Sequence, residues 1–200
     1  MLAAVRHTVV RVYLPSTMNG IRRALAARSV PVAGGLGFAV TGPLRLEYPD
    51  WSGEDLEYIA MQDASRASLR LLAGDGSGVD EAGAPAAMGA DPRGGWDPSE
   101  APLRVVFAVD VEDPLVVPRP ELDRAVVAVS GPVDWSRVAA VHIDGADAGP
   151  AVRDAVAVID AADLGDEDAE FVLGSVEDFD LAWYAPDEVS YLVEELDAAD

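Results

Sequence analysis

Short runs of β-branched and aromatic residues most constrain what this chain can fold into. They lie at residues 8–15 (TVVRVYLP), 38–41, 103–111 (LRVVFAVDV), 124–129 and 138–143. Runs of this length and composition are typical of β-strands, and we expect the first to be a central strand. The last two are close enough in the chain to form an antiparallel hairpin.

Between and after these runs, apolar residues recur at helical spacing. Ser52, followed three residues later by Asp55, marks the start of the clearest helix, and Gly74 its end. Helices are also predicted over residues 16–28, 43–48, 147–159, 166–172 and 186–196. Strands and helices do not alternate strictly. The pattern predicts an α+β fold with a single mixed or antiparallel sheet of about five strands and about five helices packed on it.

Residues 74–101 lack any periodicity and contain seven Gly and three Pro. So long a stretch without secondary structure is unusual inside a compact domain, so we expect a linker or disordered loop there. Residues 10–73 and 102–200 are then two parts of one domain. Residues 1–9 are predicted to be an N-terminal extension.

Charge is distributed unevenly along the 200 residues, which carry 14 Arg, no Lys and 36 acidic side chains, a net charge of −22. Residues 1–46 contain six Arg and no acid, whereas residues 144–200 contain eighteen acids and one Arg. We expect the two ends to attract each other across the fold. The overall charge argues against general nucleic-acid binding and against binding to anionic membranes.

Several classes of protein are excluded by what the sequence lacks. The chain has no Cys, which removes disulfides, thiolate metal sites and Cys nucleophiles. It has no apolar run of the ~20 residues that a membrane-spanning helix needs, and its first residues lack the apolar core of a signal peptide. We predict a cytoplasmic protein without a cofactor.

An acidic cluster near residue 165 is the first candidate site. Carboxylates gathered on one helix face can bind Mg²⁺ or Ca²⁺. The spacing does not match a calcium-binding EF-hand loop, and it equally fits a solvated acidic turn followed by a helix start. The candidate ligands are Asp163, Asp166, Glu167, Asp168 and Glu170.

His142 and Asp144 form the second candidate, a catalytic pair. Residues two apart in a strand point to the same side, so a His–Asp pair is geometrically possible. Such a pair can serve as a general base and the group that orients it. The sequence places no clear nucleophile nearby, and a His on the polar face of a half-buried strand fits equally well.

The junction of the first strand and helix is the third candidate, an anion-binding site. Arg11 and Tyr13 share one strand face, and Ser16 and Arg22 follow at the helix. Free N–H groups at a helix start attract anions. However, residues 15–20 (PSTMNG) match no phosphate-binding motif, and a capped helix whose Arg residues face acidic partners explains the same pattern.

Six sequence blocks give the chain a family resemblance that covers nearly all of it except residues 74–101. The blocks are RVYLPSTMNGIRRAL, FAVTGPLR, EDLEYIAMQDASRASLRLL, VSGPVDWSRVAAVHID, GDEDAEFVL and LAWYAPDEVSYLV. They resemble a family of small actinobacterial proteins with no assigned function. The resemblance implies a cytosolic bacterial protein, transfers no catalytic residue, and suggests Val10 as an alternative native start.

Two functions therefore follow from the sequence. The first is a non-catalytic interaction or regulatory module whose acidic C-terminal half binds a basic protein partner. The alternative is a small enzyme or anion-binding domain with its site at the first strand–helix junction. Convergence of the candidate side chains in one place would favour the second.

Overall fold

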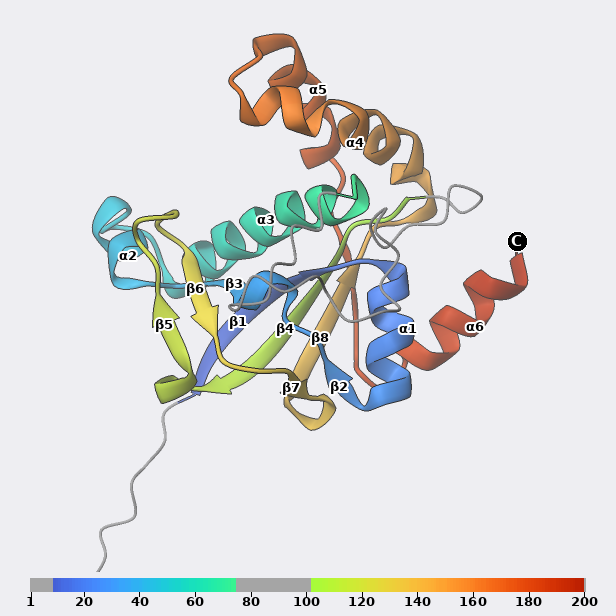
Figure 1. Ribbon diagram of the computed structural model, residues 1–200, viewed down its shortest axis with the longest axis horizontal. Helices are drawn as coiled ribbons and strands as arrows, with labels where there is room; N and C mark the ends of the chain where they lie inside the picture. The colour runs from blue at the N-terminus through green and yellow to red at the C-terminus, as the bar shows by residue number, and fades with distance from the viewer. Residues whose placement is uncertain (1–8, 75–101, 200) are drawn as a thin grey trace, which may run out of the picture.

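The computed structural model describes residues 9–74 and 102–199 (Figure 1). The predicted extension and linker lie almost wholly outside these residues and stay predictions. A central strand, β1 (Val9–Ser16), lies between β3 (Leu36–Ala39) and β4 (Val105–Glu112) in a seven-stranded sheet. The sheet order is β5-β6-β3-β1-β4-β8-β9, and every neighbouring pair is antiparallel. The other strands of the sheet are β5 (Val116–Pro118), β6 (Val126–Val129), β8 (Val138–Ile143) and β9 (Ala182–Tyr184).

Six α-helices and a two-stranded ribbon complete the described residues. The ribbon pairs β2 (Ser29–Val30) with β7 (Val133–Asp134). The helices are α1 (Met18–Ala27), α2 (Gly42–Glu47), α3 (Gly53–Leu72), α4 (Gly149–Asp163), α5 (Glu167–Glu177) and α6 (Val189–Ala199). Single 3₁₀ turns lie at Ala33–Gly35, Asp113–Leu115, Trp135–Arg137 and Ala146–Ala148.

The structure confirms the α+β class and the central position of β1, and it corrects the strand count. The main sheet has seven strands rather than about five, because β5 and β9 have three residues each and are too short to show a pattern. The predicted hairpin between residues 124–129 and 138–143 is wrong. β6 pairs with β3 and β5, whereas β8 pairs with β4 and β9.

Each face of the sheet carries its own helical layer because side chains alternate along a strand. On one face, Leu14 and Phe107 pack against Ile21 of α1 and Val189 of α6. On the other face, Tyr13 and its neighbours pack beneath α3. The residues that share this second core include Val106, Ala108, Leu56 and Ala60.

A third layer lies outside α3. Helices α4 and α5 form a hairpin, called here the α4–α5 hairpin, that packs on the C-terminal half of α3 and projects away from the sheet (Figure 1). Leu69 and Leu72 of α3 contact Val152, Ile159 and Leu173 of the hairpin in a small separate core. The hairpin is therefore joined to the rest of the molecule mainly through one helix.

Side chains cap the starts of α1, α2, α3 and α5, whereas α4 starts without a side-chain cap. Ser52 and Asp55 form the complete capping box of α3, as their spacing predicts. Helix α1 is capped by Thr17, one residue after the predicted start of the helix at Ser16, because Ser16 still belongs to β1 and pairs with Val105. Within residues 9–74 and 102–199, no helix is long and apolar enough to cross a membrane.

Candidate functional site

Two of the predicted junction residues, Arg11 and Tyr13, lie on the α3 side of the sheet. Arg11 donates two hydrogen bonds to Asp110 on β4, at 2.7 and 3.3 Å. The Tyr13 hydroxyl donates to Glu57 of α3 at 3.2 Å, and burial together with the Glu57 charge raises the pKa of Tyr13. Both polar groups are therefore satisfied within the fold.

The other two junction residues point elsewhere. Ser16 is buried, and its backbone carbonyl accepts a hydrogen bond from Ser68 of α3. Arg22 lies on α1, which covers the opposite face of the sheet, and its guanidinium contacts Asn19 and Asp197. The structure does not bring Arg11, Tyr13, Ser16 and Arg22 together, so they form no common anion site.

His142 and Asp144 do not form the predicted pair. Strand β8 ends at Ile143, so the alternation rule does not extend to Asp144. The Asp144 carboxylate instead binds the guanidinium of Arg104 at 2.8 to 3.2 Å and the Arg104 backbone N–H at 2.7 Å. The Arg104 guanidinium also donates to the carbonyl of Phe179, and both side chains are fully buried. The pair ties the ends of β4 and β8 to the segment before β9.

His142 is half-buried on β8, opposite Val106 of β4 and Trp183 of β9. Burial lowers the pKa of His142, and the nearby positive charge of Arg11 lowers it further. The ring is therefore held in its neutral form near pH 7. The Asp144 carboxylate binds Arg104, so it does not orient the His142 imidazole as a general base.

The five predicted metal ligands serve the α4–α5 hairpin in separate ways. Asp163 accepts two hydrogen bonds from Arg70 of α3, and Glu170 accepts two from Arg66. The Arg70 guanidinium lowers the pKa of Asp163. Asp166 caps α5 by accepting from the Ala169 N–H at 2.9 Å, while Glu167 and Asp168 are exposed in its first turn. Among the residues described here, no three His, Cys, Asp or Glu side chains are grouped as metal ligands.

The expected attraction between the two ends of the chain is present at Arg22 and Asp197, which join α1 to α6. The acidic residues of the hairpin pair with a different part of the chain. Two of them pair with Arg66 and Arg70, which come from α3 rather than from residues 1–46. Spacing alone does not predict these partners, because the positions of Arg66 and Arg70 fit any exposed helix face.

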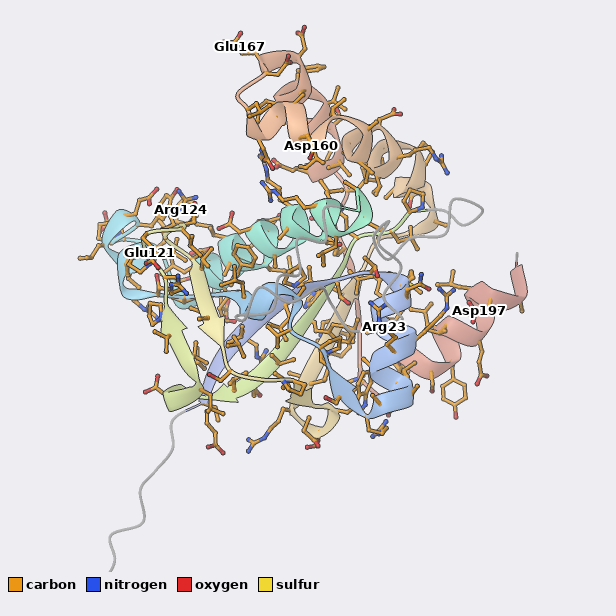
Figure 2. The ribbon with its side chains drawn as sticks, in the orientation of Figure 1. Arg23, Glu121, Arg124, Asp160, Glu167 and Asp197 are labelled. Carbon is orange, nitrogen blue, oxygen red and sulfur yellow. The ribbon has the colours of Figure 1, made fainter. Side chains whose placement is uncertain are left out.

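Two large apolar side chains are exposed on the α4–α5 hairpin. Leu164, at the end of α4, is 90% exposed, and Phe171 on α5 is 80% exposed. They stand among acids: residues 149–177 contain eight acidic side chains and one Arg. Figure 2 shows Glu167 at the tip of the hairpin and Asp160 nearer α3. Phe171 was not a candidate from the sequence, because a single aromatic residue in an amphipathic helix normally indicates the buried face.

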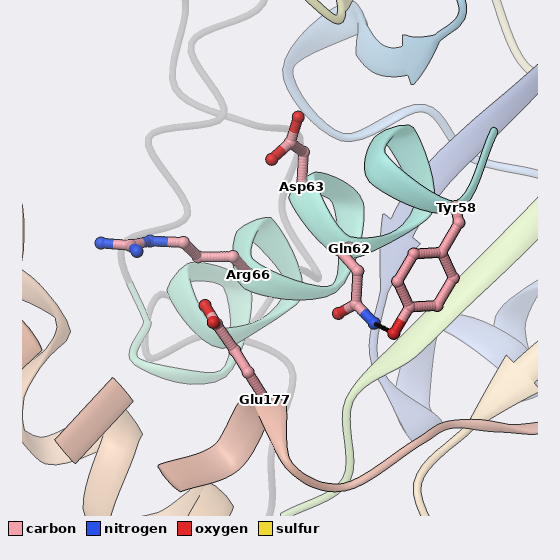
Figure 3. Close-up of a pocket in the computed structure, with 5 residues that line it drawn as sticks. All are labelled: Tyr58, Gln62, Asp63, Arg66 and Glu177. Atoms are coloured by element: carbon pink, nitrogen blue, oxygen red, sulfur yellow. Dashed lines mark hydrogen bonds between the residues drawn. The ribbon is translucent and has the colours of Figure 1, made fainter. Parts of the chain in front are cut away.

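A pocket of about 390 Å³ opens between α3 and the end of α5 (Figure 3). Tyr58, Gln62, Asp63 and Arg66 line it from α3, and Glu177 lines it from the last turn of α5. Gln62 donates a hydrogen bond to the Tyr58 hydroxyl at 2.7 Å. The pocket holds both charges and an aromatic ring, and none of its residues was a sequence candidate.

Asp63 is the unusual member of this pocket. Its Oδ2 atom is buried and has no hydrogen-bond partner among the described residues. Burial raises the pKa of Asp63 to about 6, and the charges of Asp123 and Glu177 add to the effect, while Arg124 and Arg66 oppose it. A buried, unpaired carboxylate oxygen costs free energy, so it marks a place where a donor would be favourable.

The fold and these clusters define an antiparallel α+β domain with an acidic helical hairpin added to one helix. The family of unknown function DUF6912 matches residues 10–193, and the chain belongs to this family. Searches of curated proteins and of solved structures found no match. The actinobacterial source suggested by the sequence blocks stays a prediction.

Proposed function

We propose that this protein is a non-catalytic interaction module whose α4–α5 hairpin binds a basic, partly apolar segment of a partner protein. The observation that carries the proposal is the exposure of Leu164 and Phe171 on an acidic element. Single exposed apolar residues are common, but two on one projecting hairpin provide an apolar contact. The surrounding carboxylates select a partner of opposite charge.

The distribution of charge supports the same partner. After Arg66 and Arg70 bind Glu170 and Asp163, the hairpin still presents Glu167, Asp168 and Asp160 to solvent. These exposed charges attract a basic chain over distances up to about 10 Å at 0.1 M salt. The expected result is fast, salt-sensitive association that is completed by apolar contact.

The catalytic hypothesis receives less support from the geometry. Its candidate residues are used in separate contacts: Asp144 binds Arg104, Tyr13 binds Glu57, and Arg22 lies on the opposite side of the sheet. An interaction module requires only the exposed hairpin, which the described residues provide.

The test uses a defined probe, an 18-residue helical peptide of Leu and Lys, titrated into ¹⁵N-labelled protein at low salt. We expect chemical-shift changes centred on residues 160–175. The double variant Leu164→Ser/Phe171→Ser should bind about tenfold or more weakly, because it loses the apolar contact. The matched control is Tyr191→Ser, which removes an exposed aromatic from α6.

A second arm tests the charges. Glu167→Gln/Asp168→Asn should weaken binding and reduce its salt dependence, whereas Glu194→Gln/Glu195→Gln removes the same charge from α6 and should change binding far less. Equal binding by the hairpin variants and their α6 controls, or shift changes centred away from the hairpin, would show that the proposal is wrong.

A further inference from the structure

We propose that the outer edge of β9 binds an extended, basic segment of a partner protein as an added strand. In the sheet order β5-β6-β3-β1-β4-β8-β9, β9 pairs with β8 on one side, and the described residues provide no strand on the other side. Such an edge presents backbone N–H and C=O groups with which an extended chain can pair. The site lies outside the α4–α5 hairpin, so it is additional to the proposed function and is tested separately from it.

The two edges of the sheet differ in how they are protected. The opposite edge strand, β5, contains Pro118 and is followed by Pro120, and Pro lacks the N–H that a pairing strand needs. Strand β9 has the sequence Ala-Trp-Tyr, without Pro and without a charged residue. Proteins commonly protect an exposed edge with Pro, with charged side chains or with a short strand, and β9 has only its short length. Its backbone is therefore the more accessible of the two for pairing.

Trp183 provides an apolar contact at this edge. Its side chain is 61% exposed, although it lies in the middle of β9. It is directly opposite His142 of β8, which is in turn opposite Val106 of β4, so the three side chains share one face of the sheet. A residue of an added strand opposite Trp183 would lie on that face and cover part of the indole ring. Exposed Trp side chains that become buried on binding contribute strongly to affinity.

Acidic residues on both sides of β9 determine the charge of the partner. Asp180 precedes the strand and Asp187 follows it, and both are exposed. Neither forms an ion pair among the described residues, whereas Asp163 and Asp197 bind Arg70 and Arg22. Lys or Arg residues at the two ends of an added segment would therefore meet negative charge that the fold leaves uncompensated.

The same acids disfavour a second copy of this chain as the partner. Two β9 strands paired antiparallel about Trp183 would bring together the segments that carry Asp180 and Asp187 in each copy. Like charges on adjacent strands repel, and each chain carries a net charge of −22. A basic segment of another protein forms the same backbone pairing without this repulsion.

The probe is the peptide acetyl-Lys-Lys-Val-Thr-Val-Lys-Lys-amide, titrated into the whole ¹⁵N-labelled protein at low salt. Its centre favours an extended chain, and its ends carry the positive charges. We expect chemical-shift changes centred on residues 180–187 and on the indole N–H of Trp183. Trp183→Ser should weaken binding about tenfold. Trp51→Ser, which removes a half-exposed Trp far from β9 in the sequence, is the matched control and should leave binding unchanged.

Backbone pairing is tested by N-methylation of the peptide. Successive N–H groups of a strand point to opposite sides, so only alternate ones face β9. One peptide is methylated at both Val nitrogens and another at the Thr nitrogen. One of them should lose binding and the other should retain it. Equal binding by the two methylated peptides would show that the peptide does not add as a strand and that the inference is wrong.

The charge of the edge is tested with Asp180→Asn/Asp187→Asn. This variant should bind the peptide about threefold more weakly and with less dependence on salt, because two attractive charges are lost. Glu194→Gln/Glu195→Gln removes the same charge from α6 and should have a smaller effect. Equal effects of the two double variants would show that Asp180 and Asp187 do not select the partner.

Two further measurements separate this inference from its alternatives. The hairpin variant Leu164→Ser/Phe171→Ser should bind the extended peptide as the natural protein does, and Trp183→Ser should still bind the helical Leu/Lys peptide. Failure at one surface is therefore distinct from failure at the other. Sedimentation should show no dimer at the concentrations used. A dimer that Trp183→Ser dissociates would assign the edge to a second copy and overturn the inference.

Discussion

Two of the regions that contain Arg–carboxylate pairs differ in how far the pairs are exposed to water. Arg104 and Asp144, at the ends of β4 and β8, are 1% and 0% exposed. Arg66–Glu170 and Arg70–Asp163, between α3 and the hairpin, are about one-third exposed or more. Each of the three guanidinium groups donates at least two hydrogen bonds to its carboxylate, at 2.6 to 3.2 Å, so geometry does not separate the pairs.

The pairs differ in the free energy that each contributes to stability, because they differ in burial. A buried charge that loses its partner cannot be solvated, so breaking such a pair costs several kcal/mol. An exposed pair is screened by water and contributes about 0–1 kcal/mol. The comparison indicates that Arg104–Asp144 maintains the sheet, whereas the exposed pairs orient the hairpin on α3. Four predictions test this difference.

The largest effect is expected at the buried pair. Arg104→Met should lower the free energy of unfolding by about 3–5 kcal/mol, because the buried Asp144 is left charged without its guanidinium partner. Denaturation by urea at pH 7 measures this change. Arg104→Met/Asp144→Leu should recover part of the loss, since no unpaired charge remains. A loss below about 1 kcal/mol in the single variant would remove the distinction between the two regions.

Asp63 provides the opposite case, an unpaired acid whose removal should stabilise the fold. Its pKa of about 6 in the folded protein exceeds the ordinary value of 3.8, so the native state disfavours ionisation and loses stability as the pH rises from about 4 to 6. Asp63→Asn should therefore stabilise the protein by about 1–2 kcal/mol above pH 7, after allowance for partial solvation.

The pH dependence of this gain is the control. Below about pH 4, where Asp63 is protonated in both the folded and unfolded states, the gain should disappear. Thermal unfolding at pH 4 and pH 7.5 measures both limits. An equal gain at the two pH values would show that ionisation of Asp63 is not its cause.

The exposed pairs should have smaller and more local effects. Arg66→Gln/Arg70→Gln is expected to cost about 1 kcal/mol in total, and less at high salt. Hydrogen exchange should show faster opening of α4 and α5 with unchanged protection of β1 and β4. Equal loss of protection in the sheet would contradict a local role.

His142 should produce the smallest effect. Because its pKa is lowered in the folded state, the native protein disfavours the charged ring, and stability falls as the pH drops below the ordinary value of 6.5. His142→Gln should flatten the decline in melting temperature between pH 7 and pH 5. Identical slopes for the variant and the natural protein would show that His142 does not contribute.

Local sequence signals were sufficient to predict the elements that are marked by capping residues or by a continuous apolar run. The capping box at Ser52 and Asp55 predicted the start of α3, and the apolar run 138–143 coincides with β8. The helix starting near Asp166 was also predictable, because an acid at the cap and acids in the first turn suit the N-terminus of a helix.

Pairings across the chain were not predictable in this way. The proposed His142–Asp144 pair relied on strand alternation, which stops where β8 ends, and the partner of Asp144 lies 40 residues away. The spacing of the acids around residue 165 suggests one cluster. In the structure two of them pair with Arg residues of α3, and a third caps α5. No spacing rule relates such distant residues.

The sequence by itself determined the α+β class, the central first strand and the acidic C-terminal region, because β-branched runs, caps and charge act over a few residues. The tertiary structure alone decided the strand order, the burial of Arg104 with Asp144 and the exposure of Phe171. These depend on which elements meet, and burial changes the free energy of a charge or an apolar side chain only after they have met.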